Sequence, residues 1–462
     1  MAALRMLAWR GGIALTVRQL VGMVISFAGL IGLARLIGPA AYGIYVSALA
    51  LHTFLVVFFQ WGTDVFLLRR PQEPEPDHVH QALTLSLALG LLGVALAWPA
   101  GILAERWIGT RGVAEAVTAL FCGMPLQLAA QVPSALLQRQ MAYRRVAQAE
   151  LAGHLALYAA GLGAAFAGLG LAAPLIGWWT QQVVLAVFFF RLAKYRPRLV
   201  WRRALLAELL AYGLGYSAAG WVWQVRTLAN PLIVARFLGP EAAASVAVAT
   251  RLVESLSFMR LVLWRVALPA LARLQGDKAR LAHAVGEGAR FQVLAVAPAI
   301  AAFALAAPVV VPLAFGKDWS PVVVVFPFLA LASLVNSMLS LHSSALYVLG
   351  RNREVALFHA ANVLVLAAAG LTLVPRLGLV GYGLSEAAAL VTYLLLRRAA
   401  ERVLGHVDLW LPATWAAAFA LPLFADRIGP AAWLAPPAVL LLPATRRTLA
   451  AWWGQVKEAA FG

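Results

Sequence analysis

Charged side chains are scarce in this chain of 462 residues, of which 12% are charged and 63% are hydrophobic. About a quarter of the residues of an average soluble protein are charged. Two or three soluble domains would each need a polar exterior that so few charges cannot supply, and a disordered chain would not be this apolar. The composition therefore excludes both classes and indicates a polytopic membrane protein.

Cysteine is nearly absent, because Cys122 is the only one, and a single thiol excludes an intrachain disulfide scaffold. The chain also lacks a Walker-type Gly-x-x-x-x-Gly-Lys-Ser/Thr loop for ATP and any spaced cluster of cysteine and histidine ligands. We therefore expect a protein that is not an enzyme, with no catalytic residue, no metal site and no resident cofactor.

Long apolar runs are what the chain has in abundance. A helix that crosses a bilayer needs about 20 mainly apolar residues, and about 14 such runs are present. They predict an all-α polytopic membrane protein, since the alternation of membrane strands is missing. Prolines interrupt the last two runs, which are the weakest. The runs cover about residues 12–34, 41–67, 81–103, 113–136, 147–168, 171–191, 207–235, 242–264, 291–314, 322–348, 354–374, 379–396, 409–425 and 430–445.

The positions of the basic residues explain why the chain has 37 lysines and arginines but only 19 acidic residues. With a cytoplasmic amino terminus, 25 of the 37 fall in loops on the cytoplasmic side and 7 in loops on the other side. Basic residues concentrate in the cytoplasmic loops of membrane proteins. The bias predicts that both termini are cytoplasmic, and no nucleic-acid partner is needed to explain the net charge.

A short motif near the start of the chain recurs after its middle. Residues 33–39 read Leu-Ala-Arg-Leu-Ile-Gly-Pro, and residues 234–240 read Val-Ala-Arg-Phe-Leu-Gly-Pro. In each copy we expect the arginine, Arg35 or Arg236, to cap the carboxyl end of its own helix and the Gly-Pro pair to force a turn. Each copy ends a long apolar run, so the repeat predicts two lobes.

The repeat divides the chain into four predicted segments. Two six-helix lobes cover residues 1–195 and 204–400, a basic cytoplasmic linker covers 196–203, and two extra helices with a cytoplasmic tail cover 401–462. Lobes with an even number of spans share one orientation and usually enclose a cavity that opens to alternate sides, which favours a transporter. The end of the tail, residues 446–461, is either a short helix on the inner leaflet or a frayed end.

Ionisable side chains at membrane depth are costly and therefore indicate function. Arg226 precedes Arg236 by ten residues of helix, or about 15 Å, which places it near the middle of the membrane. Arginine binds phosphate through its planar fork and indole rings stack on sugars, so we predict a cationic cavity for an anionic substrate with a bulky polar head. The predicted substrate-binding residues are Arg18, Arg226, Arg251, Trp221, Trp223 and Gln224.

Each of the three arginines also has a structural interpretation. Arg226 can form an ion pair with Asp64 or donate a hydrogen bond to a backbone carbonyl, and either contact would hold two helices together. Arg251 can pair with Glu254, which lies three residues further along the same helical face. Arg18 can extend its guanidinium to the inner interface.

Three carboxylates are candidates for binding a coupling ion, either a proton or sodium. They are Asp64, Glu254 and Glu386, all within or beside predicted spans. Each has the alternative of pairing with a neighbouring arginine or of lying at the membrane interface. Two further arginines, Arg260 and Arg265, are assigned to the interface.

Several segments of the sequence are similar to those of a known family. They are LARLIGPAAYGIY at residues 33–45, RVALPALARLQ at 265–275, FGKDW at 315–319, LGRNR at 349–353 and PRLGLVGYG at 375–383. Together they resemble the polysaccharide-transporter branch of the multidrug/oligosaccharidyl-lipid/polysaccharide (MOP) exporter superfamily. The matching segments occur in the order that the family has.

The resemblance implies a two-lobed helical fold in the bacterial inner membrane and a flippase for saccharide linked to undecaprenyl pyrophosphate. The product would be an exopolysaccharide, a capsule or an O-antigen repeat unit, with membrane lipids and a glycan polymerase or export complex as partners. Three alternatives stay open: a lipid II flippase, a drug/cation antiporter of the same superfamily and an integral-membrane glycan polymerase.

Overall fold

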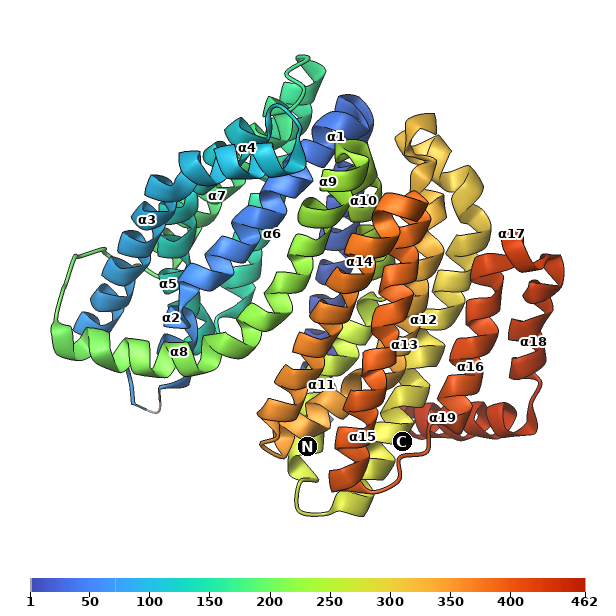
Figure 1. Cartoon of the computed structure of the whole chain (residues 1–462). Coiled ribbons are helices and arrows are strands. Elements are labelled where there is room, and N and C mark those ends of the chain that lie inside the picture. The colour runs from blue at the N-terminus through green and yellow to red at the C-terminus, as the bar shows by residue number, and fades with distance from the viewer. Residues whose placement is uncertain (1, 71, 462) are drawn as a thin grey trace. The chain divides into compact units, whose positions relative to one another are not determined.

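The computed structural model of the chain consists of helices joined by turns (Figure 1). It describes residues 2–70 and 72–461, with side chains at residues 22, 24–68, 70, 72–211, 213, 221, 222, 224–260, 263, 267 and 270–454. Within these residues no strand is present. The prediction of an all-α protein is therefore confirmed.

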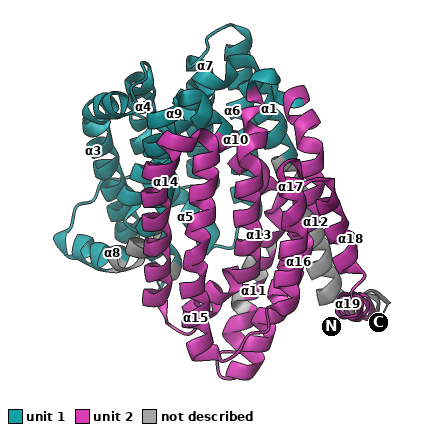
Figure 2. Cartoon of the chain, turned by 45° about the vertical axis from the view of Figure 1, so that its right-hand side comes forward, with its two compact units in different colours: residues 1–245, 314–318 teal, residues 246–313, 319–462 magenta. Residues whose placement is uncertain are grey.

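The chain divides into two compact units, which Figure 2 distinguishes by colour. Unit 1 comprises residues 1–245 and 314–318, and unit 2 comprises residues 246–313 and 319–462. This division reflects packing rather than sequence repetition. The lobes and linker inferred from the duplicated motif therefore remain a prediction.

Unit 1 is assembled on its first helix, α1, which packs against α4, α6 and α8, while α6 pairs with α7 and α3 with α4 and α5. The turns between neighbours are short, so helices that follow one another in sequence pack side by side. Its helices are α1 (Ala2–Gln60), α2 (Thr63–Arg69), α3 (Pro76–Ile108), α4 (Val113–Phe121), α5 (Met124–Arg139), α6 (Tyr143–Phe166), α7 (Ala172–Leu192), α8 (Arg203–Val225), η1 (Arg226–Leu228), η2 (Asn230–Val234) and α9 (Ala235–Leu238).

Unit 2 is organised around α13, which packs against α11, α14, α15 and α16. The helices from residue 240 onward are α10 (Pro240–Leu256), α11 (Phe258–Arg273), α12 (Lys278–Phe315), η3 (Lys317–Trp319), α13 (Pro321–Val348), α14 (Asn352–Ala389), η4 (Leu390–Thr392), α15 (Tyr393–Leu404), α16 (Trp410–Ala420), η5 (Leu421–Phe424), α17 (Ala425–Ile428), η6 (Pro430–Leu434), α18 (Ala435–Leu440) and α19 (Pro443–Phe461).

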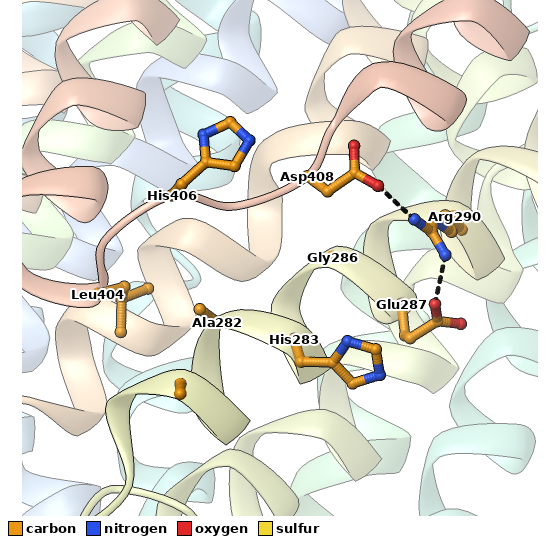
Figure 3. Close-up of a pocket in the computed structure, with 9 residues that line it drawn as sticks. Ala282, His283, Gly286, Glu287, Arg290, Leu404, His406 and Asp408 are labelled. Carbon is orange, nitrogen blue, oxygen red and sulfur yellow. Dashed lines mark hydrogen bonds and ion pairs between the residues drawn. The ribbon is translucent and has the colours of Figure 1, made fainter.

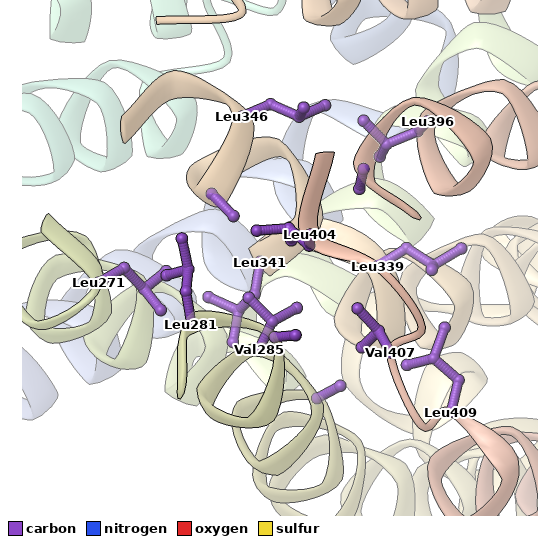
Figure 4. Close-up of a cluster of buried hydrophobic side chains, with 14 of the residues drawn as sticks. Leu271, Leu281, Val285, Leu339, Leu341, Leu346, Leu396, Leu404, Val407 and Leu409 are labelled. Atoms are coloured by element: carbon purple, nitrogen blue, oxygen red, sulfur yellow. The ribbon is translucent and has the colours of Figure 1, made fainter. Parts of the chain in front are cut away.

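A buried apolar cluster joins five helices, α11 to α15, at one end of unit 2 (Figure 4). Leu281 and Val285 of α12 and Leu396 of α15 are fully buried in it, together with leucines of α11 and α13. Burying a leucine or valine side chain contributes about 1.5–3 kcal/mol. The cluster therefore fixes this end of α12 against the segment that leads to α16.

Seven of the described helical stretches are long and apolar enough to cross a bilayer. The chain is therefore a multi-pass membrane protein, and the total of 14 spans stays a prediction. The last two predicted runs are divided, as their prolines indicate, into α16, η5 and α17 and into η6 and α18. The seven stretches are Val24–Gln60, Pro76–Ile108, Val113–Arg139, Ala172–Leu192, Lys278–Phe315, Lys317–Val348 and Asn352–Leu404.

Both copies of the duplicated motif make the same backbone turn. Gly38 has φ 78° and ψ 167°, and Gly239 has φ 84° and ψ 175°. Only glycine adopts this conformation readily, and the proline that follows it in each copy begins the next helical segment. The Gly-Pro turn expected from the sequence is therefore confirmed in both copies.

The capping of its own helix by each arginine of the motif stays a prediction, and the contacts described for the two arginines lie outside those helices. Arg35 Nη1 donates a hydrogen bond to the carbonyl of Ala314, at the end of α12, over 3.1 Å. The Arg236 guanidinium lies over the ring of Trp107, 5.5 Å from its centroid. Arg35 thus caps the carboxyl end of a helix 279 residues away in sequence.

The segment that follows the first motif copy contacts the second copy within unit 1. A Cβ atom added to Gly43, four residues after the first Gly-Pro pair, would lie 1.8 Å from the carbonyl oxygen of Pro240 in the second copy. The backbone of α1 therefore touches the start of α10, and only glycine permits this approach.

We predict that Gly43→Ala lowers the free energy of unfolding by about 1–3 kcal/mol, because a backbone carbonyl cannot yield as a flexible side chain would. Gly163→Ala is the matched control, since that helical glycine of α6 faces open space. Thermal unfolding of the two purified variants in the same detergent measures the difference. Equal melting temperatures would contradict the close approach.

The basic segment after α7 is tied to the amino-terminal half of α3. The Val200 N–H donates to the Thr84 hydroxyl over 2.9 Å, and Tyr195 and His80 are hydrogen-bonded over 2.8 Å. Arg202 donates its backbone N–H to Gln81 and also forms a 2.7 Å ion pair with Asp77. The segment predicted as a linker is therefore held in place by side chains of unit 1.

Candidate functional site

The candidate site in unit 1 begins where α8 loses its regular winding. The predicted span at residues 207–235 is not one continuous α-helix: α8 ends at Val225, a 3₁₀ turn covers Arg226–Leu228, and a π-helix covers Asn230–Val234. Pro231 lies within this stretch and has no N–H to continue the α-helical pattern. Such changes of winding occur frequently at functional sites. Arg226 is the first residue of the irregular turn.

Two predicted residues beside Arg226 have defined partners. The Trp221 indole N–H donates to the carbonyl of Val57 in α1 over 3.1 Å, and its ring lies 4.8 Å from that of Phe58. The Gln224 side-chain amide donates to the Thr227 hydroxyl over 3.3 Å, and that hydroxyl donates to the Gln224 carbonyl over 2.7 Å. Trp221 thus attaches the end of α8 to α1, and Gln224 stabilises the 3₁₀ turn.

Two of the predicted substrate-binding side chains lie outside the described residues. They are those of Arg18 in α1 and Trp223 in α8. Asn230, at the start of the π-helix, is an additional polar residue of this region. Its amide donates to the Ala243 carbonyl over 3.1 Å, while its buried oxygen accepts no hydrogen bond from the residues that the structure describes.

The candidate site in unit 2 contains the ion pair that the sequence offered as one interpretation of Arg251. Arg251 Nη1 and Glu254 Oε2 are 3.1 Å apart, and the two side chains are 64% and 54% exposed. An ion pair this exposed contributes about 0–1 kcal/mol. The pair therefore adds little to the stability of the fold.

Arg260, which the sequence assigned to the membrane interface, instead reaches into unit 2. Its Nη1 donates to the Ser333 hydroxyl of α13 over 3.3 Å, and Ser333 is hydrogen-bonded to Ser257 over 2.7 Å. Both serines are buried. The sequence signal for this cluster is a serine and an arginine three residues apart, at positions 257 and 260, in an otherwise apolar stretch.

The carboxylates proposed for a coupling ion have different surroundings. Glu386 of α14 is 3% exposed and accepts a hydrogen bond from the Tyr382 hydroxyl over 2.9 Å. Asp64 lies in the first turn of α2, between two of the seven apolar stretches, and its Oδ1 is buried with no hydrogen-bond donor among the described residues. Burial raises the pKa of Asp64, which favours its protonated form. Their role in coupling stays a prediction.

A separate cavity of about 390 Å³ lies between the start of α12 and the segment before α16 (Figure 3). His283 and His406 line it, and Arg290 lies at one side with ion pairs to Glu287 and Asp408. Two carboxylates already neutralise this arginine, so the cavity does not have the charge of an anion site. Its ion pairs connect α12 to the carboxyl-terminal segment. Among the described residues no group of three or more side chains has the arrangement of a metal site.

Comparison with known proteins identifies the family. The model of a family described as polysaccharide biosynthesis protein matches residues 32–324, which include both copies of the motif. The chain belongs to this family. The resemblance inferred from the motifs is thereby confirmed.

Two curated proteins are similar to this chain. The succinoglycan biosynthesis transport protein ExoT of Rhizobium meliloti is 26% identical over 356 residues, which cover 73% of this chain and 68% of that protein. The amylovoran biosynthesis protein AmsL of Erwinia amylovora is 26% identical over 232 residues, which cover 49% of this chain and 60% of that protein.

Solved structures of other proteins establish the fold of this chain. The lipid II flippase MurJ in an inward closed conformation has a TM-score of 0.71 and 11% identity, covering 96% of this chain and 99% of that one. An inward-facing MATE multidrug transporter of the MOP superfamily has a TM-score of 0.64 and 18% identity, covering 82% and 95%. The chain therefore has the fold of MOP superfamily transporters.

We predict that Tyr382→Phe lowers the free energy of unfolding by about 1–3 kcal/mol, because it removes a hydrogen-bond donor from the buried Glu386 carboxylate. Tyr143→Phe removes the hydroxyl of an exposed tyrosine and is expected to have no measurable effect. Chemical unfolding of both variants measures the two losses. Equal losses would show that the hydrogen bond to Glu386 contributes nothing specific.

Proposed function

We propose that this protein is a flippase that moves a saccharide linked to undecaprenyl pyrophosphate across the bacterial inner membrane. The observation that carries the proposal is the family match over residues 32–324, with a curated relative named as a transport protein over 73% of the chain. The fold supports it. One structural neighbour, which covers 96% of the chain, is named as a flippase, and another, which covers 82%, is named as a transporter. The saccharide is a repeat unit of an exopolysaccharide, capsule or O-antigen.

The pyrophosphate carries the charge that the protein has to accommodate during the transfer. Arg226 stands at the irregular turn of unit 1, and Arg251 of unit 2 forms an ion pair with the exposed Glu254. One guanidinium group can donate two parallel hydrogen bonds to phosphate oxygens, and each such charge-assisted hydrogen bond contributes about 1.5–3 kcal/mol. We assign these two arginines, with Arg18, to the pyrophosphate, and Trp221, Trp223 and Gln224 to its surroundings.

Transport proceeds by alternating access, in which the saccharide is exposed first to one side of the membrane and then to the other. Both termini and the basic segments lie in the cytoplasm, and 14 helices span the inner membrane. Asp64, Glu254 and Glu386 are the carboxylates at which a proton or sodium ion would be taken up and released. A glycan polymerase or export complex receives the product on the outer side.

The test is translocation of a labelled oligosaccharide on undecaprenyl pyrophosphate in inverted membrane vesicles. We predict that Arg226→Ala and Arg251→Ala each lower the initial rate about tenfold to a hundredfold, because each removes charge-assisted hydrogen bonds to the pyrophosphate. Arg226→Lys and Arg251→Lys keep the charge but lose the fork, and intermediate rates are expected for them.

Arg398→Ala is the matched control, since that arginine is exposed on α15 and belongs to neither candidate site. It should translocate at the wild-type rate. Unchanged rates in both alanine variants would overturn the assignment of the arginines. Transport of lipid II in place of the oligosaccharide would replace the proposed substrate by that of a peptidoglycan flippase.

A further inference from the structure

The last helix, α19, runs across the ends of α16 and α18 rather than parallel to them (Figure 1). It has 19 residues and is not among the stretches that are apolar enough to cross a bilayer. A helix in this orientation, at the end of a membrane bundle, lies close to the level of the lipid headgroups.

One face of α19 is fixed to unit 2. The Trp415 indole N–H donates to the Thr445 hydroxyl over 2.8 Å, and both side chains are buried. The ring of Trp452 lies 5.4 Å from that of Phe291 and 6.5 Å from that of Trp415. Thr445 and Trp452 are seven residues apart, or two helical turns, so they share one face. The rotation of α19 about its own axis is therefore determined.

The adjacent face of α19 carries Arg446, Leu449 and Trp453, which we call the outer stripe. Their spacing of three and four residues places them in one row. Arg446 is exposed, and Leu449 and Trp453 are 36% and 63% exposed. Tryptophan favours the membrane interface, and arginine beside it reaches toward phosphate groups. Ala451 is also exposed but lies on the other side of the docked face.

We propose that the outer stripe is a binding surface for anionic phospholipid, with Leu449 and Trp453 between the upper acyl chains and Arg446 at a lipid phosphate. The charge favours this occupant, because residues 443–454 contain two arginines and no acidic residue. Two apolar side chains present far less area than a stable protein interface needs, which argues against a protein partner. The surface is independent of the substrate that the protein transports.

The first test places a fluorophore on each side of the docked face. Cys122→Ser removes the only native thiol, and Leu449→Cys or Ala451→Cys then carries an environment-sensitive label in lipid nanodiscs. We expect a blue-shifted emission at residue 449 and strong quenching by lipids with a nitroxide near the headgroup. The label at residue 451 should show the emission and weak quenching of a water-exposed site. Equal behaviour at the two positions would overturn the proposal.

The second test measures the preference for anionic lipid. The label at residue 449 is quenched with nitroxide-labelled phosphatidylglycerol and, separately, with phosphatidylcholine that has the same labelled chain. We expect stronger quenching by phosphatidylglycerol and a loss of up to about fivefold in that preference for Arg446→Gln, since one basic residue near a membrane surface contributes about 1 kcal/mol. Arg447→Gln, about 100° further round the helix, should have a smaller effect. An unchanged preference in Arg446→Gln would refute the assignment.

Discussion

Peptide groups within the apolar layer of a membrane have to find their hydrogen-bond partners inside the protein, and this constraint governs the whole structure. Regular helices satisfy it, but each interruption of a helix leaves carbonyl or N–H groups without partners. Long polar side chains supply several of them here. Arg35 donates to the carbonyl of Ala314 at the end of α12, and Trp107 donates to the carbonyl of Leu232 in the π-helix. The interruptions can therefore persist where the bundle requires them.

The same constraint makes the buried polar contacts more important for stability than the exposed ones. Ser257 and Ser333 are buried and hydrogen-bonded to each other, and the Tyr382 hydroxyl donates a hydrogen bond to the buried Glu386. Removing such a partner leaves a polar atom unsatisfied at a cost of about 1–3 kcal/mol. Arg251, by contrast, forms an exposed ion pair with Glu254, and such a pair contributes only about 0–1 kcal/mol.

The sequence predicted the helical architecture and both Gly-Pro turns because these follow from local chemistry. A long apolar run that lacks the alternation of a barrel strand satisfies its peptide groups in a bilayer as a helix, and glycine at positions 38 and 239 is the residue that best tolerates the observed φ angles. The partners of the arginines were only partly predicted. Arg226 and Arg251 were named from their depth, whereas the contact of Arg260 with Ser333 depends on how α11 packs against α13.

By itself the sequence determined the class of protein and the family, because composition and motif order are properties of the chain alone. Only the tertiary structure decided which partner each polar residue has. Arg35 caps a helix 279 residues away, and Trp415 fixes the rotation of α19 through Thr445. Such pairings depend on distances between helices that are remote in sequence, and a local pattern contains no information about those distances.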